Sequence, residues 1–306
     1  MEPCTAPVWH SIGSAGGMDL DQTLSSGQCF RWEKQEDGWH GIAAGRSVTA
    51  RVDDAGQLCL FCPREEDGFW HHYFALDTDY AAIQDRFSAS KRLTACVAAA
   101  PGLRVLNQPF FEVLCTFIIS QNNNIPRIRG IVERLCLLCG EPVAGDGRAF
   151  PTPEALAAQT PQTMAVLRAG WRSDYLLDAA RRVCNGSLDP GLLASLKTQE
   201  ARAVLMTTKG VGPKVADCVL LYGLGFADAC PMDVWMKRAM ARLFPRGMPR
   251  AARGLEGIAQ QYIFEYARTH LPKGQPKPSR KGRKSPAKKG LSAAGKTLPH
   301  EPEQSC

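Results

Sequence analysis

The sequence predicts an α+β fold in which a small antiparallel β-sheet domain with packed helices is followed by a mostly α-helical domain. Between about residues 19 and 62, short β-prone runs alternate with turn signals such as Asp37-Gly38 and Ala55-Gly56. From Pro63 onward, apolar residues recur with helical spacing instead. A chain of 306 residues, 44% of them hydrophobic, is long enough to bury two cores.

The short turns between the β-prone runs predict an antiparallel meander. Its strands are expected at 29–32, 39–43, 48–52 and 58–61. An apolar stripe that includes Trp70 and Phe74 then begins the helical part. The later helices are expected at 108–120, 124–139, 162–169, 172–185, 198–207, 212–224, 233–243 and 254–270.

The net charge of +7 is concentrated at the C-terminus. Residues 271–306 hold nine Lys or Arg and two Glu, which leaves 28 basic and 28 acidic residues in the preceding part. DNA binding must therefore be argued from motifs and not from net charge. The tail lacks large apolar residues over 273–289 and is expected to be disordered. It could attract phosphates, act as a solubilising extension, or serve nuclear import if the source is a eukaryote.

The chain has twelve cysteines and no N-terminal signal sequence, a pattern that predicts a reduced, intracellular protein. No apolar run is long enough to span a bilayer. Two CxxC pairs suggest zinc, but we expect none: Cys59 and Cys62 would lie on opposite faces of a strand, and Cys136 and Cys139 would end a core helix. Neither a metal nor a cofactor is expected.

A helix-hairpin-helix is predicted around Gly210-Val211-Gly212, between a helix that ends near Thr208 and a second that begins at Pro213. Glycines let backbone N–H groups approach closely, and the second helix adds a partial positive charge at its N-terminus, which suits one DNA phosphate. A helical hairpin without any ligand is equally compatible with this motif.

Lys214 lies in the first turn of the second helix, where the helix dipole disfavours an ammonium group. A neutral amine at this position could act as a nucleophile. Alternatively, Lys214 could form an ordinary ion pair with Asp217, three residues later. Cys218 shares the face of Lys214 and could line the same pocket or simply fill the core.

Two further segments carry polar residues at predicted helix ends. Asp233 precedes a helical run and is expected to be its N-cap, a position that keeps a carboxylate ionised and able to stabilise a cation. Asn122-Asn123-Asn124 lies between two apolar helices, with Arg127 just behind it. These amides could cap and turn the chain, or fill the space left by an extruded base.

Together these segments resemble the 8-oxoguanine DNA glycosylases of the helix-hairpin-helix (HhH-GPD) superfamily. The matching segments are Ser26-Gly27-Gln28-Cys29-Phe30-Arg31-Trp32, Asn122-Asn123-Asn124-Ile125-Pro126-Arg127-Ile128, Val132-Glu133-Arg134-Leu135-Cys136, Gly210-Val211-Gly212-Pro213-Lys214-Val215-Ala216-Asp217-Cys218 and Pro231-Met232-Asp233-Val234. The expected organisation is an N-terminal stub (1–18), a TBP-like antiparallel β domain with helices (19–100), a helical HhH-GPD domain (101–270) and a basic disordered tail (271–306).

The resemblance implies a bifunctional glycosylase and abasic-site lyase that acts on duplex DNA containing 8-oxoguanine. Lys214 would attack C1′ of the flipped nucleotide and form a Schiff base, and Asp233 would stabilise the sugar cation. The Gly27 carbonyl would accept the N7–H of the lesion, which guanine lacks. Cys218 and Phe264 would sandwich the base, and Gln260 would bind its Watson–Crick edge.

On the opposite strand, the resemblance implies that Asn122, Arg127 and Arg172 contact the orphaned cytosine while Trp171 forms a wedge. Trp235 stands where better-known eukaryotic members have histidine, so stacking would replace a contact of that ring. The compact form favours a prokaryotic source, and hence the bacterial cytoplasm or nucleoid, with the nucleus expected for a eukaryote. The protein is expected to be a monomer without membrane contact. The alternatives are excision of another damaged purine, which Lys214 discriminates, and noncatalytic DNA binding, against which Lys214 and Asp233 argue.

Overall fold

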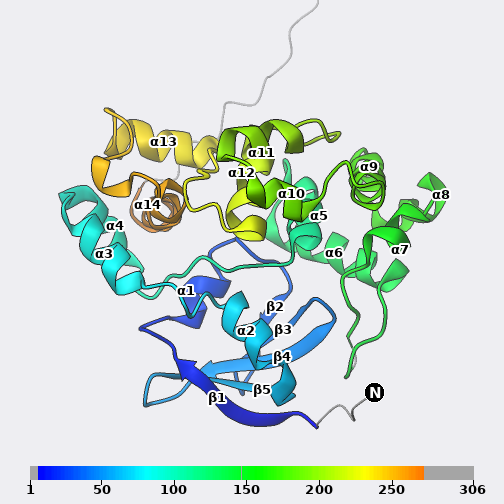
Figure 1. Ribbon diagram of the computed structural model, residues 1–306, viewed down its shortest axis with the longest axis horizontal. Helices are drawn as coiled ribbons and strands as arrows, with labels where there is room; N and C mark the ends of the chain where they lie inside the picture. Colours follow the sequence, from blue (N-terminus) through cyan, green and yellow to red (C-terminus); the bar gives the residue numbers. More distant parts are fainter. Residues whose placement is uncertain (1–5, 146, 272–306) are drawn as a thin grey trace, which may run out of the picture. The chain divides into compact units, whose positions relative to one another are not determined.

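The computed structural model describes residues 6–145 and 147–271. Its N-terminal part is a five-stranded sheet with the order β1-β5-β4-β3-β2, in which all neighbouring strands are antiparallel (Figure 1). The strands are β1 (Val8–Ser14), β2 (Trp32–Lys34), β3 (Trp39–Ala43), β4 (Arg46–Val52) and β5 (Gln57–Cys62). The predicted α+β fold is confirmed. The expected basic tail lies, from residue 272 on, outside the described residues.

Strand β1 corrects the expectation that residues 1–18 are a stub outside the sheet. It pairs with β5 from Val8, opposite Cys62, to Ser14, opposite Gln57. Its sequence gives a weak strand signal because its one buried side chain is the polar His10. The register also shifts between Ser11 and Ser14, and this bulge interrupts the two-residue alternation.

An aromatic cluster holds helix α2 (Asp67–Tyr73) against the buried face of the sheet. The indole of Trp32 donates a hydrogen bond to the Tyr73 hydroxyl at 2.8 Å and packs edge-on against Phe74, with ring centroids 5.6 Å apart. Gly41 is required beneath Trp32, because a Cβ at that position would lie 2.4 Å from the indole ring. This packing makes the sheet a rigid support for the loop between α1 and β2.

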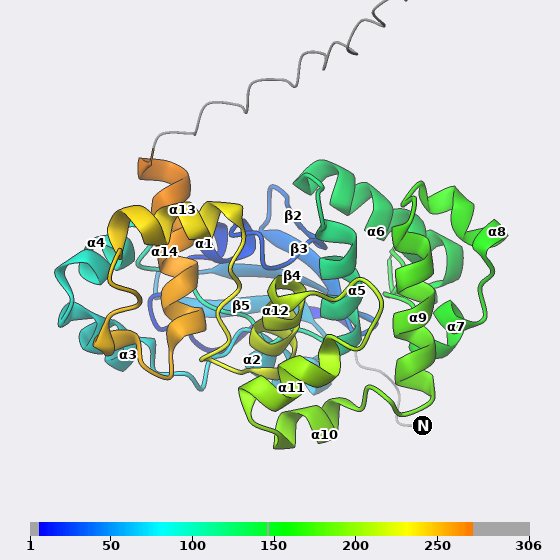
Figure 2. The ribbon, with the colours of Figure 1, turned by 90° about the horizontal axis from the view of Figure 1, so that it is seen from above.

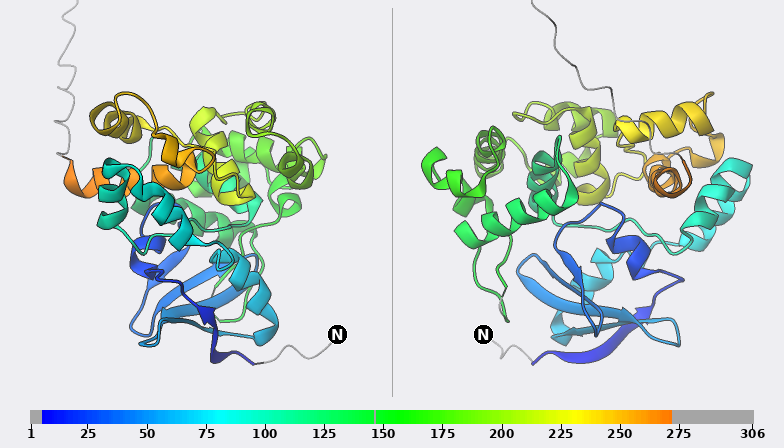
Figure 3. Two further views of the ribbon diagram at one scale, coloured as in Figure 1. Left: turned by 60° about the vertical axis from the view of Figure 1, so that its left-hand side comes forward. Right: turned by 180° about the vertical axis from the view of Figure 1, so that it is seen from behind.

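Helices form the rest of the described chain and lie on one side of the sheet (Figures 1 and 3). Besides α2 they are α1 (Leu20–Leu24), α3 (Tyr80–Ser88), α4 (Lys91–Ala99), α5 (Phe110–Ser120), α6 (Ile125–Cys139), α7 (Pro153–Ala157), α8 (Pro161–Met164), α9 (Arg172–Cys184), α10 (Pro190–Ser195), α11 (Thr198–Leu205), α12 (Pro213–Leu224), α13 (Val234–Leu243) and α14 (Glu256–His270). None of these described helices is long and apolar enough to cross a bilayer.

Most of the long helices match their predicted ranges within a few residues. The helix expected at 162–169 is instead α8 followed by a 3-10 turn, which ends at Arg168 with a φ of 53°. Helices α1, α7 and α10 were not predicted, because five or six residues are too few to show a helical period.

Helices α5 and α12 lie side by side at the centre of the helical core (Figure 2). Most of α5 is apolar and buried, and α12 buries every residue from Val215 to Tyr222. Helices α3 and α4 contribute their buried residues to this core and not to the sheet, and α4 packs against α14. Phe30 joins the same core, and thereby anchors the loop before β2 to the helices.

Candidate active site

A cavity of about 250 Å³ lies between the loop after α1 and the helices α5, α12 and α14. Six of the predicted site residues line it: Gly27, Lys214, Cys218, Asp233, Gln260 and Phe264. The other lining residues are Ser26, Phe30, Phe117, Ser120, Asn123, Ile125, Ile128, Tyr222, Pro231, Gln261 and Arg268. The residues expected to act on a flipped nucleotide, which are scattered over more than 230 positions of the chain, thus surround one space.

Lys214 reaches the cavity from the first turn of α12. Its Nζ lies 4.6 Å from the centroid of the Phe117 ring, and Cys218 follows four residues later on the same helix. The ion pair considered for Asp217 is formed with a different residue: Arg202 Nε donates to Asp217 Oδ1 at 2.6 Å. Among the described residues, no ion pair involves Lys214. Its amine is therefore not neutralised by a neighbouring carboxylate.

The predicted helical hairpin is present, with α11 and α12 joined by the turn that contains Gly210, Val211 and Gly212. Gly210 has a φ of +77°, and a Cβ there would lie 2.0 Å from the Tyr175 ring. Both the backbone conformation and the close approach require glycine at this position. Gly212 has a φ of −95° and no heavy atom within 4 Å of an added Cβ. Only the first glycine is therefore needed to form the turn.

Asp233 is the N-cap of α13, as predicted. Its Oδ1 accepts a hydrogen bond from the backbone N–H of Met236 at 2.6 Å. The carboxylate thus lies at the N-terminal end of α13, where the helix dipole is positive. Asp233 also lines the cavity, so the cap places an acidic group at the cavity wall.

The loop that carries Gly27 is held by the amide of Gln28, whose side chain is fully buried. Gln28 Nε2 donates to the carbonyl oxygens of Thr23 at 3.0 Å and Arg104 at 2.7 Å, and Oε1 accepts from the N–H of Leu106 at 2.9 Å. Gly27 itself has a φ of +83°, which the absence of a Cβ permits.

Helix α14 holds the same loop from the other side. Gln261 Nε2 donates to Ser26 Oγ at 3.3 Å, and Arg268 Nη1 donates to the Ser25 carbonyl at 3.2 Å. These contacts fix the position of Gly27 relative to Gln260 and Phe264, which face the cavity from α14.

Cys218 and Gln260 give the cavity lining an apolar contact surface and one polar atom without a partner. Gln260 is 4% exposed, and no described residue forms a hydrogen bond with its Oε1. Burial raises the pKa of the Cys218 thiol to about 11, although nearby Lys214 opposes the shift, so Cys218 is a neutral, polarisable contact surface. A buried amide oxygen without a partner is costly, and a bound donor would relieve that cost.

Most of the chain matches two known protein-family models. Residues 13–114 match the family model described as 8-oxoguanine DNA glycosylase, N-terminal domain, and residues 115–260 match the HhH-GPD superfamily base excision DNA repair protein model. An N-glycosylase/DNA lyase of Saccharomyces cerevisiae is 30% identical over 253 residues, which cover 73% of this chain and 67% of that protein. The chain belongs to the 8-oxoguanine DNA glycosylase family.

Solved structures agree with this assignment. The structure of Clostridium acetobutylicum 8-oxoguanine glycosylase/lyase with DNA containing cytosine opposite 8-oxoguanine has a TM-score of 0.76 and 35% identity, and the match covers 82% of this chain and 92% of that one. MBOgg1 in complex with a low-affinity DNA ligand has a TM-score of 0.79 and 35% identity, over 87% and 97% of the two chains.

The remaining residues predicted for this glycosylase lie outside the lining of the cavity. Asn122 is exposed, with a φ of 48°, and Arg127 is exposed on the first turn of α6. Trp171 and Trp235 are 46% and 39% exposed, an unusual degree of exposure for indole rings.

Arg172 differs from these residues because it is only 4% exposed. Its guanidinium donates to the carbonyl oxygens of Gln121 and of Ala169, and it lies 4.2 Å from the centroid of the Trp171 ring. Burial, and then the charge of Arg127, lower the pKa of Arg172. It thus supports the asparagine loop from behind.

Sequence reasoning missed several residues that line the cavity. Tyr222 lies four residues after Cys218 on α12, and Arg268 lies four residues after Phe264 on α14, so helical spacing could have identified both. The contribution of Phe117 depends on the packing of α5 against α12, which no local pattern shows.

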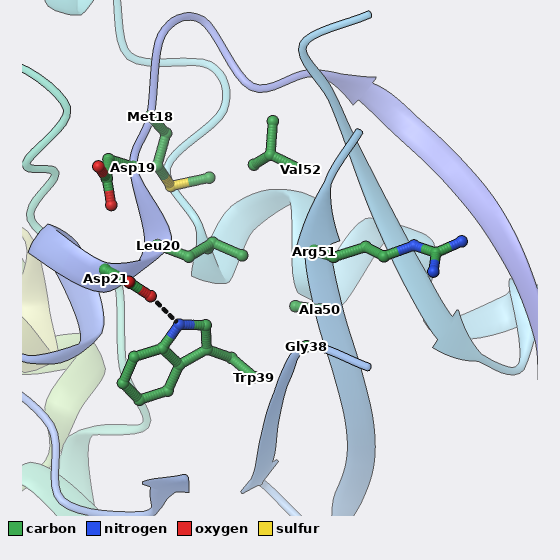
Figure 4. A pocket seen from close by; sticks show the side chains of 9 residues that line it. All are labelled: Met18, Asp19, Leu20, Asp21, Gly38, Trp39, Ala50, Arg51 and Val52. Carbon is green, nitrogen blue, oxygen red and sulfur yellow. Dashed lines mark hydrogen bonds between the residues drawn. The ribbon is translucent and has the colours of Figure 1, made fainter. Parts of the chain in front are cut away.

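A second hollow of about 340 Å³ lies on the sheet domain and is lined by none of the predicted site residues (Figure 4). Asp21 accepts a hydrogen bond from the Trp39 indole at 2.7 Å and is paired with Lys34, and these hydrogen bonds lower its pKa. Both contacts satisfy the carboxylate within the domain, so the hollow offers no free reactive group.

Proposed function

We propose that this glycosylase excises 8-oxoguanine from duplex DNA and then cleaves the abasic strand through a Schiff base on Lys214. The observation that supports this most strongly is the convergence of the Lys214 amine, the Asp233 carboxylate and the unpartnered Gln260 amide oxygen on one cavity. A nucleophile, a charge that stabilises a cation and a hydrogen-bond acceptor for a base are the parts that base excision needs.

In the first step, the Lys214 amine uses its lone pair to form a bond to C1′ while the glycosidic bond breaks. The electron pair of the broken bond leaves with the base, which takes up a proton, and the positive charge that develops on the sugar faces Asp233. Opening of the sugar ring gives an iminium ion. Loss of a C2′ proton then expels the 3′ phosphate and nicks the strand.

Recognition of the lesion rests on other residues of the cavity lining. The Gly27 carbonyl accepts a hydrogen bond from the N7–H, which 8-oxoguanine has and guanine lacks. Gln260 Oε1 accepts a hydrogen bond from an N–H on the Watson–Crick edge of the base. Cys218 and Phe264 pack on the two faces of the ring. Guanine in this site would face the Gly27 carbonyl with a lone pair, an unfavourable contact.

On the opposite strand, Asn122 and Arg127 contact the orphaned cytosine, and Trp171 fills the space that the lesion leaves. Arg172 supports this contact through the Gln121 carbonyl, because its own side chain is buried. Trp235 stacks beside the lesion. The turn Gly210-Val211-Gly212 binds a phosphate through backbone N–H groups other than that of Val211, which donates to the Thr208 carbonyl at 3.1 Å.

We also propose that the protein acts as a monomer in a reducing compartment, with the bacterial cytoplasm or nucleoid favoured. One chain supplies the whole lining of the cavity. The ten cysteines within the described part of the chain are free thiols. Light scattering of the purified protein with and without duplex DNA tests the monomer, and a two-to-one complex would contradict it.

Borohydride reduction of the protein with lesion-containing duplex tests the mechanism. A covalent complex should form with wild-type protein and with Lys91→Gln, and it should be absent from Lys214→Gln. Lys91 is the matched control because it is an exposed lysine in the first turn of α4, far along the chain from the cavity lining. Strand cleavage without any trapped complex would rule out the Schiff base.

The same assay tests specificity when the lesion is placed opposite each of the four bases and compared with guanine opposite cytosine. We expect trapping to favour the lesion strongly. Equal reaction with guanine would eliminate the role of Gly27, whatever the outcome for Lys214. EDTA should leave the trapped yield unchanged, because Lys214 and Asp233 supply the proposed chemistry without a metal.

A further inference from the structure

Three potential metal ligands lie close together in the sheet domain, one each from β1, β5 and the start of α2. They are the His10 imidazole, the Cys62 thiol and the Asp67 carboxylate, and one ligand atom of each lies within 4.8 Å of the others. His10 and Cys62 are 8% and 0% exposed, whereas the side chain of Asp67 is 37% exposed. None of the three lines the cavity that contains Lys214.

The strand register brings His10 and Cys62 together. Val8 pairs with Cys62 and His10 pairs with Leu60, so His10 and Cys62 are diagonal neighbours on the buried face of the sheet. Asp67 begins α2, which covers that face. The ligands thus come from three elements, and the strand pairing and the packing of α2 fix their relative positions.

The hydrogen bonds of His10 orient its ring as in a metal ligand. Its Nδ1 lies 2.9 Å from the Val8 carbonyl, which can only accept, so Nδ1 carries a proton. Nε2 lies 2.6 Å from Asp67 Oδ1 in a direct hydrogen bond, which a metal ion would replace by binding both atoms. Metal-binding histidines almost always donate their other ring N–H to a carbonyl or carboxylate in this way.

The surroundings of the thiol favour a cation. Cys62 is fully buried, and a carboxylate oxygen of Asp67 lies within 4.8 Å of its sulfur. Glu65 and Glu66 stand just before Asp67 in the chain, so acidic groups give the region of this polarisable sulfur a negative potential. A divalent cation would turn this unfavourable environment for a thiolate into a favourable one.

We propose that His10, Cys62 and Asp67 bind one zinc ion, with water as the fourth ligand. Sulfur, imidazole nitrogen and carboxylate oxygen are the usual zinc ligands, and a set of this composition discriminates against magnesium and calcium. Tetrahedral zinc with bonds of about 2.0–2.3 Å separates its ligand atoms by about 3.3–3.7 Å. The Asp67 side chain is free enough to open its contact with His10 to that distance.

Zinc binding would release the thiol proton of Cys62 and would replace the hydrogen bond between His10 and Asp67. The ion would cross-link β1, which pairs only with β5 in the described sheet, to the start of α2. Its expected effect is on the stability of the edge strand and not on base excision. The inference does not depend on the proposed function.

Cobalt titration of the metal-free full-length protein tests the site. Tetrahedral cobalt bound by one thiolate should give a sulfur-to-cobalt charge-transfer band and visible d–d bands that saturate at one equivalent, and zinc should abolish both. Cys62→Ser should lose the charge-transfer band. Cys59→Ser is the matched control, because Cys59 lies on the same strand but pairs with Ser11 on the opposite face of the sheet.

Two further variants guard against misfolding. Asp67→Asn alters a partly exposed side chain, and it should keep the charge-transfer band but bind cobalt more weakly. Zinc should raise the melting temperature of wild-type protein and of Cys59→Ser, but not that of Cys62→Ser. Absence of the band in wild-type protein, or its survival in Cys62→Ser, would show that His10 and Asp67 form only an ion pair.

Discussion

The cavity lining has two parts, a lysine end on helix N-termini and a base end on a loop, and different kinds of structure hold them. At the lysine end, Lys214 and Asp233 lie at the N-termini of α12 and α13, where the helix backbone fixes their position. At the base end, Gly27 lies on an irregular loop. Hydrogen bonds to residues 76 and 78 positions from Gln28, and 235 positions from Ser26, hold that loop in place.

Because of this difference, substitutions that impair the chemical step should differ in their effect on stability from substitutions that impair lesion recognition. Substitution at the lysine end should change the reaction rate with little effect on folding, since each side chain depends on local geometry. Substitution at the base end should reduce stability and lesion discrimination together, because the loop shares its hydrogen bonds with the core.

Asp233→Asn should give the largest effect and the cleanest separation. Asparagine is as good an N-cap as aspartate, so the helix terminus is retained while the charge is lost. We expect the single-turnover rate of base excision to fall about 10²–10³-fold, the usual cost of removing one group that stabilises a transition state. Thermal unfolding should be nearly unchanged. A large fall in melting temperature would show that Asp233 is primarily structural.

Gln28→Leu should act in the opposite manner. It removes the partners of two carbonyl groups and one N–H in a fully buried region, so the free energy of unfolding should fall by about 3 kcal/mol or more. The preference for 8-oxoguanine over guanine should fall with it. Gln199→Leu, on the exposed face of α11, is the control and should change stability by less than about 0.5 kcal/mol. Unaltered discrimination would mean that the loop does not need this anchor.

The same division explains how much the sequence could predict. The hairpin and the Asp233 cap depend on short-range signals, namely glycine with positive φ, proline at a helix start and a carboxylate before a helical run. These signals predicted the helix ends at which Lys214 and Asp233 lie. Strand β1 was missed because its buried position is occupied by His10, and alternation of apolar residues cannot show a polar ligand.

Tertiary contacts account for the rest. No sequence pattern shows that Asp217 pairs with Arg202 and leaves Lys214 free, or that Phe117 on α5 packs beside the amine. The position of Gly27 near Gln260 came from the family resemblance and not from the residues themselves. Burial of Arg172 was likewise hidden, because an arginine at a helix start predicts an exposed side chain.

Glu112 connects the two ends and gives the smallest predicted effect. Its side chain is 11% exposed, and Arg31 Nη1 lies 3.8 Å from Oε2, beyond hydrogen-bonding distance. Burial raises the pKa of Glu112 to about 7, and Arg31 opposes the shift. Arg31 belongs to the segment that carries the base end, and Glu112 begins the helix whose Phe117 contacts Lys214.

The sign of the pH dependence follows from this shift. The unfolded chain releases the Glu112 proton near pH 4.3, whereas the folded chain keeps it until about pH 7. The contribution of protonated Glu112 to the free energy of unfolding is therefore fully present below the pKa of Glu112 in the unfolded chain. This contribution is lost as the pH rises through the pKa of Glu112 in the folded protein. Glu112→Gln never ionises. Between about pH 5.5 and pH 8.5, wild-type protein should lose about 1–3 kcal/mol of stability relative to this variant in urea unfolding.

The prediction is tested by how the difference in unfolding free energy between wild-type protein and Glu112→Gln changes with pH. The variant also loses the partner of Arg31, but that loss has the same effect at both pH values. Parallel unfolding curves for wild-type protein and Glu112→Gln would show that Glu112 is already ionised and screened at the lower pH. The stability difference between the two proteins could change with pH while their excision rates keep the same pH profile. In that case the contact between Arg31 and Glu112 affects folding but not the chemistry of Lys214. If both the unfolding free energy and the excision rate of the two proteins differ in their pH dependence, the lysine end and the base end are energetically coupled through Glu112.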